Sequence, residues 1–245
     1  AFKREVHLPV FHAARITDIS TARYAVQEGL LDMVAMTRAH IADPQLVNKL
    51  ADGREQEIRP CVGATHCMSP QRPVCIHNAA TGRELKMPQQ VKRSDGTIRN
   101  VVVVGGGPAG LEATRVLAER GHKVTLFEAS PKLGGQVLIG AKASWRADLI
   151  GVIDWRASEI ERLGVEVHTS VFAEAEDVLS RDADIVIIAT GGIPDLDWLD
   201  GVENSTSAWS FLTGSAPVGS SVLVYDGTGR HQALQCAEYA VSSGA

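Results

Sequence analysis

Residues 101–110 read VVVVGGGPAG, and this stretch decides the fold class of the chain. The four valines predict a strand, and the apolar spacing over residues 111–120 predicts a helix directly after it. The spacing G-x-G-x-x-G stands between them. In dinucleotide-binding folds the first glycine makes the tight turn, the second lets the backbone approach a pyrophosphate, and the third lets helix and strand pack closely. The stretch therefore predicts an α/β domain that binds a dinucleotide, with Gly105, Gly107 and Gly110 in these roles.

Three later segments bear on which dinucleotide this is. Residues 123–127 predict a second strand that ends at Glu128, where an acid binds ribose hydroxyls in such folds. LGGQ follows at 133–136 and IIATGG at 187–192. This combination resembles the FAD-binding half of the two-dinucleotide flavoprotein reductases, which favours FAD, or its ADP portion, over NAD. A glycine-rich turn without a ligand is the alternative. The residues expected at the site are Gly105, Gly107, Pro108, Ala109, Gly110, Glu128, Gly135, Gln136, Thr190 and Gly191.

A second glycine turn lies at residues 225–232, after a strand predicted at 222–225. If Gly227 is taken as the first glycine of the pattern, Gln232 stands at the third position. If Tyr225 is taken as the first, two of the three glycines are missing. A bulky side chain at either place crowds the pyrophosphate or the contact between helix and strand. We predict that this turn does not bind a nucleotide.

Three of the four cysteines, Cys61, Cys67 and Cys75, lie close together, while Cys236 stands alone in what reads as a helix. Thiolates at such short spacings suit an iron–sulfur cluster, whose irons need soft, deprotonated sulfur ligands. By spacing alone a zinc site competes nearly equally, and three unbonded cysteines are a further alternative. The sequence therefore predicts a metal-binding loop and leaves the metal open.

Residues before the cysteines follow the order β-α-β-α. We expect strands at 8–11 and 31–36, a helix at 19–28, and a second helix at 45–52 that opens on Asp43-Pro44 as its N-cap and first turn. Two such units with short connections imply a parallel sheet, which needs further strands to close a core. After the glycine loop, a helix at 148–163 and a strand at 185–189 continue the α/β order.

The whole chain resembles the iron–sulfur flavoproteins related to trimethylamine dehydrogenase and bacterial 2,4-dienoyl-CoA reductase, of the NADH:flavin oxidoreductase type. The motifs R-P-C-x-G-x-x-x-C from Arg59 and C-x-x-N-x-x-x-G-x-E from Cys75 carry the resemblance. Within this family, CVGATHC and CIHNAATGRE look most like the N-methylproline demethylase branch. The resemblance implies an FMN-binding (β/α)8 barrel, a [4Fe-4S] loop, an FAD or ADP domain and an inserted NAD(P)-like subdomain, in that order.

On this reading the fold class is α/β: the last two βα units of a TIM barrel, a cysteine-rich loop, and a Rossmann-like domain. The chain starts without Met and stops inside a βα unit, so we expect a C-terminal piece of a longer enzyme, inactive by itself. The expected parts are a barrel remnant at 1–58, the iron–sulfur loop and a polar linker at 59–98, the FAD or ADP domain at 99–198, and the truncated NAD(P)-like subdomain at 199–245.

The resemblance also implies site residues. The FMN phosphate is expected at Ala14, Arg15, Met36, Thr37 and Arg38, consistent with phosphate binding after barrel strands seven and eight. The expected cluster ligands are Cys61, Cys67 and Cys75. Ala64 stands where the family carries a further cysteine, so His66 or a non-protein ligand completes a [4Fe-4S] cluster, or a [3Fe-4S] cluster forms. The other histidines, His7, His12, His40 and His77, are expected to be structural or solvent-facing, and no catalytic acid or base is named.

The expected reaction is oxidative N-demethylation of a small amine, such as N-methylproline or a di- or trimethylamine-like compound. Electrons would pass from FMN through the cluster to an electron-transfer flavoprotein. One alternative is an NAD(P)H-dependent 2,4-dienoyl-CoA or enoate reductase, and one of another class is a non-catalytic FAD- or ADP-binding module. The net charge of −5 and the lack of a long apolar run argue against nucleic-acid or membrane partners. We expect a cytoplasmic enzyme that is a homo-oligomer when complete.

Overall fold

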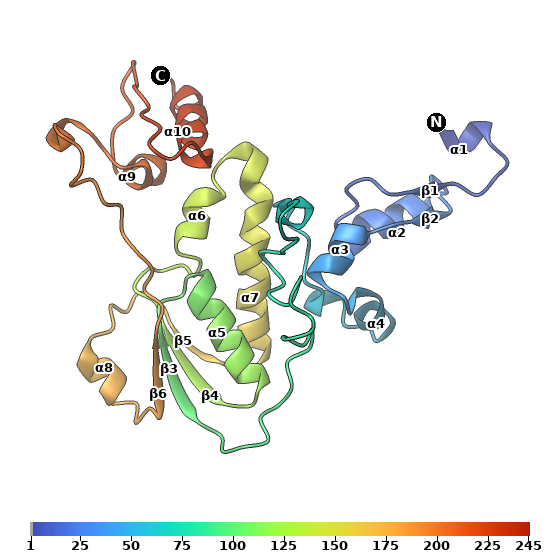
Figure 1. Ribbon diagram of the computed structural model, residues 1–245, viewed down its shortest axis with the longest axis horizontal. Helices are drawn as coiled ribbons and strands as arrows, with labels where there is room; N and C mark the ends of the chain where they lie inside the picture. The colour runs from blue at the N-terminus through green and yellow to red at the C-terminus, as the bar shows by residue number, and fades with distance from the viewer. Residues whose placement is uncertain (1) are drawn as a thin grey trace. The chain divides into compact units, whose positions relative to one another are not determined.

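The computed structural model describes residues 2–245 and divides them into two compact units, one up to Lys92 and the other Arg93–Ala245. Both units combine helices with parallel strands (Figure 1). The expected α/β class and parallel sheets are therefore confirmed, whereas the assignment of residues 1–58 to a barrel stays a prediction. No helix between residues 2 and 245 has the length and apolarity that crossing a bilayer requires.

The first unit contains a sheet of two short strands. Strands β1 (Phe11–His12) and β2 (Met33–Val34) run parallel, with Phe11 opposite Met33. We expected longer strands at 8–11 and 31–36; only these two residue pairs form the ladder, because a strand extends only where a neighbour accepts and donates its hydrogen bonds. The helices of this unit are α1 (Phe2–Glu5), α2 (Ile19–Gln27), α3 (Thr37–Ala42) and α4 (Leu46–Ala51).

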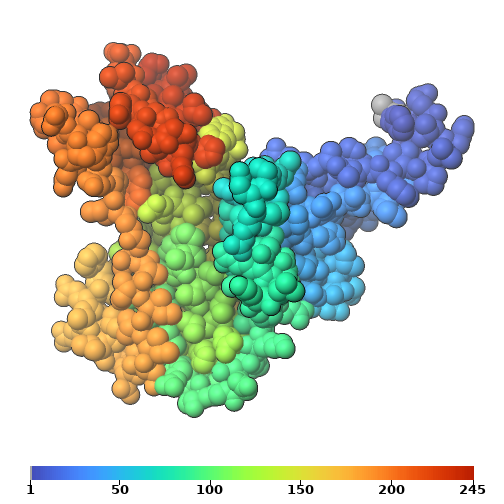
Figure 2. Space-filling model, in the orientation of Figure 1, coloured from blue at the N-terminus to red at the C-terminus, as the bar shows by residue number. Residues whose placement is uncertain are grey.

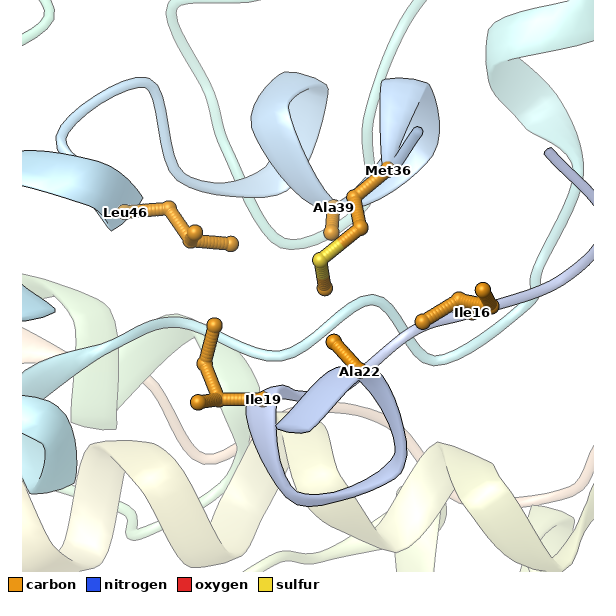
Figure 3. Packing of buried hydrophobic residues seen from close by; sticks show 6 residues of the cluster. All are labelled: Ile16, Ile19, Ala22, Met36, Ala39 and Leu46. Carbon is orange, nitrogen blue, oxygen red and sulfur yellow. The ribbon is translucent and has the colours of Figure 1, made fainter. Parts of the chain in front are cut away.

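Helices α2, α3 and α4 enclose a small apolar core. Its buried side chains come from these helices and their flanks, and they face one another in Figure 3: Ile16, Ile19, Ala22, Met36, Ala39 and Leu46. Helix α2 starts where the sequence predicts, because the side chain of Asp18 accepts a hydrogen bond from Thr21 N at 2.8 Å and caps the helix.

Asp43 is not the N-cap of α4, which is Gln45, although Asp43 Oδ1 accepts a hydrogen bond from Gln45 N at 2.9 Å. Helix α4 begins after Gln45, and Asp43 instead ends α3, a short helix that the sequence analysis did not predict. The carboxylate of Asp43 is buried, pairs with Lys49 Nζ at 2.7 Å, and accepts a hydrogen bond from Arg59 N at 2.8 Å. This carboxylate therefore fixes the chain two residues before Cys61 against the α3–α4 corner.

The second unit is built on a four-stranded parallel sheet in the order β5-β4-β3-β6. Its strands are β3 (Asn100–Val104), β4 (Lys123–Phe127), β5 (Glu166–His168) and β6 (Ile185–Ile188). The central strand is buried, and the side chains of Val101, Val102 and Val103 have no exposed surface. Helices α5 (Pro108–Glu119) and α7 (Gly151–Arg162) pack against each other, and α8 (Ala175–Leu179) precedes β6 (Figure 1). The strands and helices expected at 101–127, 148–163 and 185–189 are thus confirmed to within a few residues.

The end of the chain forms a small cluster of helices. Helix α6 (Gln136–Gly140) contacts α9 (Ala208–Thr213), which packs against α10 (His231–Ser242), seen in orange and red in Figure 2. Cys236 is buried in this cluster, as expected for a helix residue. The strand expected at 222–225 is wrong: in the described part of the chain these residues pair with no strand, although Val222 and Val224 pack on the cluster.

Candidate functional site

The glycine loop between β3 and α5 contains glycines with two different surroundings. A Cβ atom at Gly105 would lie 2.3 Å from Ala189 O, and one at Gly110 would lie 1.8 Å from Gly105 O. A Cβ atom at Gly107 would meet no atom of the described residues within 4 Å. Gly105 and Gly110 therefore permit close backbone packing, whereas Gly107 borders open space. This is the division of roles that dinucleotide binding requires.

The open space lies at the start of α5. Gly107 is the N-cap of this twelve-residue helix, Pro108 follows at its first position, and no side chain among residues 2–245 caps it by hydrogen bonding. The first N–H groups of a helix have no partner within the helix, and the helix dipole favours negative charge there. The loop can therefore receive a pyrophosphate, so the residues present fit the dinucleotide that the sequence predicts.

The other two glycine segments reach the same loop. Gly134 N donates a hydrogen bond to Gly106 O at 2.8 Å, and a Cβ atom at Gly135 would lie 3.2 Å from Gly107 Cα. From the third segment, Gly192 O accepts a hydrogen bond from Gln136 Nε2 at 3.4 Å. The segments at 105–110, 133–136 and 187–192 therefore meet at the carboxyl ends of β3, β4 and β6. These segments contain the expected site residues Pro108, Ala109, Thr190 and Gly191.

Glu128 has a structural contact that the sequence analysis missed. Its side chain is buried, with one carboxylate oxygen accepting a hydrogen bond from Gly106 N at 2.6 Å and the other from Ser130 N at 2.7 Å. The carboxylate thus holds the glycine loop in place. Each oxygen can accept more than one hydrogen bond, so the expected contact of Glu128 with a ribose stays a prediction.

In the second glycine turn, an aspartate side chain accepts hydrogen bonds from the backbone of the same turn. Asp226 accepts hydrogen bonds from Thr228 N at 3.0 Å and Gly229 N at 2.9 Å, and these bonds hold the pKa of its carboxyl below the usual value. They occupy backbone donors that a pyrophosphate would need. Gln232 is exposed on α10, so the expected crowding of a contact between helix and strand at this residue is wrong. Crowding of a pyrophosphate by a bulky side chain at this turn stays a prediction. That the turn binds no nucleotide stays a prediction.

The three clustered cysteines line one pocket of the first unit. Cys61, Cys67 and Cys75 border it, and all three are unbonded thiols. Within residues 2–245 no three His, Cys, Asp or Glu side chains are placed to hold a single metal ion together. Three thiols around one pocket are the soft donors that an iron–sulfur cluster uses, so the residues present fit such a cluster.

The chain between Cys67 and Cys75 turns back on itself. Thr65 has a left-handed backbone with φ of 60°, a 3-10 helix follows at His66–Met68, and Val74 N donates back to His66 O at 3.4 Å. His77 N donates to Cys75 Sγ at 3.4 Å. Both His66 and His77 line the pocket, but His66 is exposed and His77 is 1% exposed.

The residues expected to bind an FMN phosphate lie beside the cysteine segment. Ala14 and Arg15 follow β1, and a Cβ atom at Gly63 would lie 3.8 Å from Arg15 Nη2. Met36 is the N-cap of α3, Thr37 begins this helix, and Arg38 lines the cysteine pocket. The structure thus brings both arginines to the segment that carries the thiols. This proximity could not be read from the sequence, and the phosphate role stays a prediction.

Two protein families match the chain. The NADH:flavin oxidoreductase / NADH oxidase family matches residues 1–57, and the family described as pyridine nucleotide-disulphide oxidoreductase matches residues 33–210. Both consist of oxidoreductases, and together they indicate a flavin cofactor, which confirms the class that the sequence predicts. The second match covers more than half of the chain, and the chain belongs to the pyridine nucleotide-disulphide oxidoreductase family.

Individual relatives agree with this assignment. The chain is 56% identical over 244 residues to the multifunctional alkene reductase/demethylase OYE of Caballeronia cordobensis, covering 100% of the chain and 36% of the relative. It is 50% identical to a probable N-methylproline demethylase of Rhizobium meliloti, with coverage of 98% and 36%. The solved structure of histamine dehydrogenase from Rhizobium sp. 4-9 matches with a TM-score of 0.85 and 30% identity, over 100% of the chain and 38% of its own. The chain spans about a third of the length of these relatives.

Proposed function

We propose that the chain forms part of a flavin-dependent oxidoreductase that demethylates a small amine. The observation that carries this proposal is the combination, in one chain, of an open dinucleotide loop at Gly107 and a pocket lined by three thiols. Relatives named for demethylation, at 56% and 50% identity, and another named N,N-dimethylglycine/sarcosine dehydrogenase at 41%, support an amine as the substrate.

In this proposal the backbone at the start of α5 binds the pyrophosphate of FAD or ADP. Gly107 leaves room for the phosphates, Gly105 and Gly110 let β3 and α5 approach each other, and Glu128 holds the loop. The segments around Gly135 and Thr190 border the same space. The protein contributes position and charge, and the organic chemistry belongs to the cofactor.

Arg15 and Arg38 would bind the phosphate of FMN. Guanidinium groups suit a phosphate because their planar donors match its oxygens and they keep their charge at every relevant pH. Arg38 also lines the cysteine pocket, so the expected phosphate site and the thiols share a residue.

When bound, the flavin would accept electrons from the amine and an iron–sulfur cluster would carry them singly. Cys61, Cys67 and Cys75 would hold the cluster. The electron acceptor would be an electron-transfer flavoprotein rather than a nicotinamide, because Asp226 occupies the donors of the second glycine turn. We further propose that the complete enzyme is a homo-oligomer.

Anaerobic stopped-flow mixing tests the proposal on the complete enzyme. N-methylproline or dimethylamine should bleach the flavin absorbance, whereas NADH and NADPH should bleach it slowly or not at all. Fast bleaching by NADPH, at a rate comparable to turnover, without bleaching by either amine would contradict the demethylase and favour an enoate reductase. That second candidate has its own support, since one relative is named an alkene reductase as well as a demethylase. Protein without flavin absorbance would instead indicate a non-catalytic nucleotide-binding module.

A further inference from the structure

We propose that His77 is the fourth protein ligand of an iron–sulfur cluster whose other ligands are Cys61, Cys67 and Cys75. The inference rests on the cluster named under the proposed function and adds a ligand to it. We expected His77 to be structural or solvent-facing, and His66 or a non-protein ligand to complete the cluster unless a three-iron cluster forms. The positions of the two rings in the structure favour the opposite assignment.

The composition of the pocket narrows the choice of ligand. A [4Fe-4S] cluster takes four ligands, and the pocket offers three thiols. Ala64 also lines the pocket, but its methyl group cannot bind iron. Among the pocket residues in the described part of the chain, the imidazoles of His66 and His77 are the remaining side chains with a nitrogen of the kind that binds iron in proteins.

Burial separates these two imidazoles. His77 is 1% exposed, so its ring is already ordered inside the protein where it borders the pocket. His66 is exposed on a three-residue 3-10 helix, and binding iron would require it to give up its side-chain freedom. His66 also precedes Cys67 directly, so one short turn would have to direct two consecutive side chains at the same cluster.

The backbone around His77 is held from both sides. Its N–H donates to Cys75 Sγ at 3.4 Å, which ties the imidazole position to one of the thiols. The next residue, Asn78, is buried and donates through Nδ2 to Ile41 O at 2.9 Å, while its Oδ1 accepts from Ala80 N at 3.1 Å. Ile41 belongs to α3 and lines the same pocket. The backbone that carries the His77 ring is therefore held relative to both the thiol and the pocket wall before any metal arrives.

Ligation by His77 has a chemical consequence. A neutral imidazole in place of a thiolate removes one negative charge from the ligand set, and histidine ligation raises the reduction potential of iron–sulfur centres. The N–H donated to Cys75 acts in the same direction, because hydrogen bonds to the sulfurs also set the potential. The cluster should therefore be easier to reduce than one held by four thiolates.

The test uses anaerobically purified complete enzyme labelled with nitrogen-15 histidine. Pulsed EPR of the reduced wild-type cluster should show coupling to an imidazole nitrogen. His77→Ala should lose this coupling, and its ratio of iron to sulfide should fall from about 1:1 to about 3:4, with the EPR signal of a three-iron cluster. His77→Cys should restore the four-iron cluster at a lower potential. His66→Ala, the matched control, should leave the coupling and the iron content unchanged.

Each contrary result has a separate meaning. A wild-type cluster without nitrogen coupling overturns the assignment of His77, and this measurement does not depend on any variant folding. Coupling that persists in His77→Ala, or disappears in His66→Ala, also overturns it while leaving the cluster intact. Wild-type protein without iron and sulfide overturns the electron-transfer part of the proposed function, and the inference falls with it.

Discussion

Substitutions at Gly107 and Gly110 should have opposite effects, although both glycines belong to one loop. Gly107 has an extended backbone, with φ of −73° and ψ of −179°, and a Cβ atom there meets no described atom within 4 Å. Gly107→Val should therefore lower the free energy of unfolding by no more than about 1 kcal/mol, the cost of a disfavoured N-cap residue without a steric clash. Its isopropyl group would fill the space where the pyrophosphate approaches. Each charge-assisted hydrogen bond lost is worth about 1.5–3 kcal/mol, so affinity for FAD or ADP should fall at least about tenfold.

Gly110→Ala should instead destabilise the fold. The added Cβ atom would lie 1.8 Å from Gly105 O, a backbone atom that cannot swing aside, so helix α5 and the turn must separate. Overpacking of this kind costs about 1–3 kcal/mol, against a gain in helix propensity of about 1 kcal/mol. With the overlap this large, we expect a net loss of about 2 kcal/mol, which corresponds to a melting temperature about 4–8 °C lower for a chain of this size.

Two measurements check this pair. Isothermal titration with FAD and with ADP reports affinity, and calorimetric unfolding without nucleotide reports stability. The reasoning is refuted if folded Gly107→Val protein binds FAD as tightly as wild type, because the space at Gly107 would then not be the nucleotide site. It is also refuted if Gly110→Ala melts at the wild-type temperature, since the close approach of α5 to β3 would then carry no cost.

Three further predictions follow from single contacts. Glu128→Gln should lower the free energy of unfolding of the nucleotide-free protein by about 1–3 kcal/mol, because an amide cannot accept hydrogen bonds through both of its ends; an unchanged melting temperature would contradict the role of Glu128 in holding the loop. Cys61→Ser should lower bound iron and sulfide together, since oxygen is a poor substitute for thiolate; stoichiometric zinc without sulfide in wild-type protein would exclude the cluster. The depressed pKa of Asp226 means that its stabilising effect is present above the usual aspartate pKa of about 3.9 and is lost as the pH falls through the lower folded value. As the pH falls through that range, the melting temperature of Asp226→Ala should therefore decrease less than that of wild type. Equal decreases in the two proteins would show that the Asp226 carboxylate does not stabilise the fold.

The second unit could be predicted from sequence because its signals are local. Val101, Val102 and Val103 are fully buried, so a run of apolar residues without alternation is what this strand requires. The glycine spacing then marks where the strand ends and α5 begins, since packing leaves no room for a side chain at Gly105 or Gly110. At this position the local sequence and the tertiary packing favour the same structure, so the predicted order of strand, glycine loop and helix is confirmed.

The errors arise where distant residues decide the structure. Asp43 followed by proline has the local pattern of a helix start, and its Oδ1 accepts from Gln45 N, but its Oδ2 is held by Lys49 and by the backbone of Arg59, sixteen residues away. The roles of His66 and His77 depend on which ring is buried, and burial follows from how the segment turns back on α3. A loop has no hydrophobic periodicity from which the burial of either ring could be predicted. The predicted strand lengths in the first unit are wrong for a related reason, because the hydrogen bonds to a neighbouring strand decide where a strand ends.

The contact between Glu128 and Gly106 also bears on how quickly the nucleotide binds. Because the carboxylate and the segment at 133–136 hold the glycine loop in shape, the loop needs no ordering step when the ligand arrives. Binding then carries no entropic cost for ordering the glycine loop, and association can occur in a single step. Binding should be a single kinetic phase whose rate rises linearly with nucleotide concentration, without the plateau that a slow loop closure would impose.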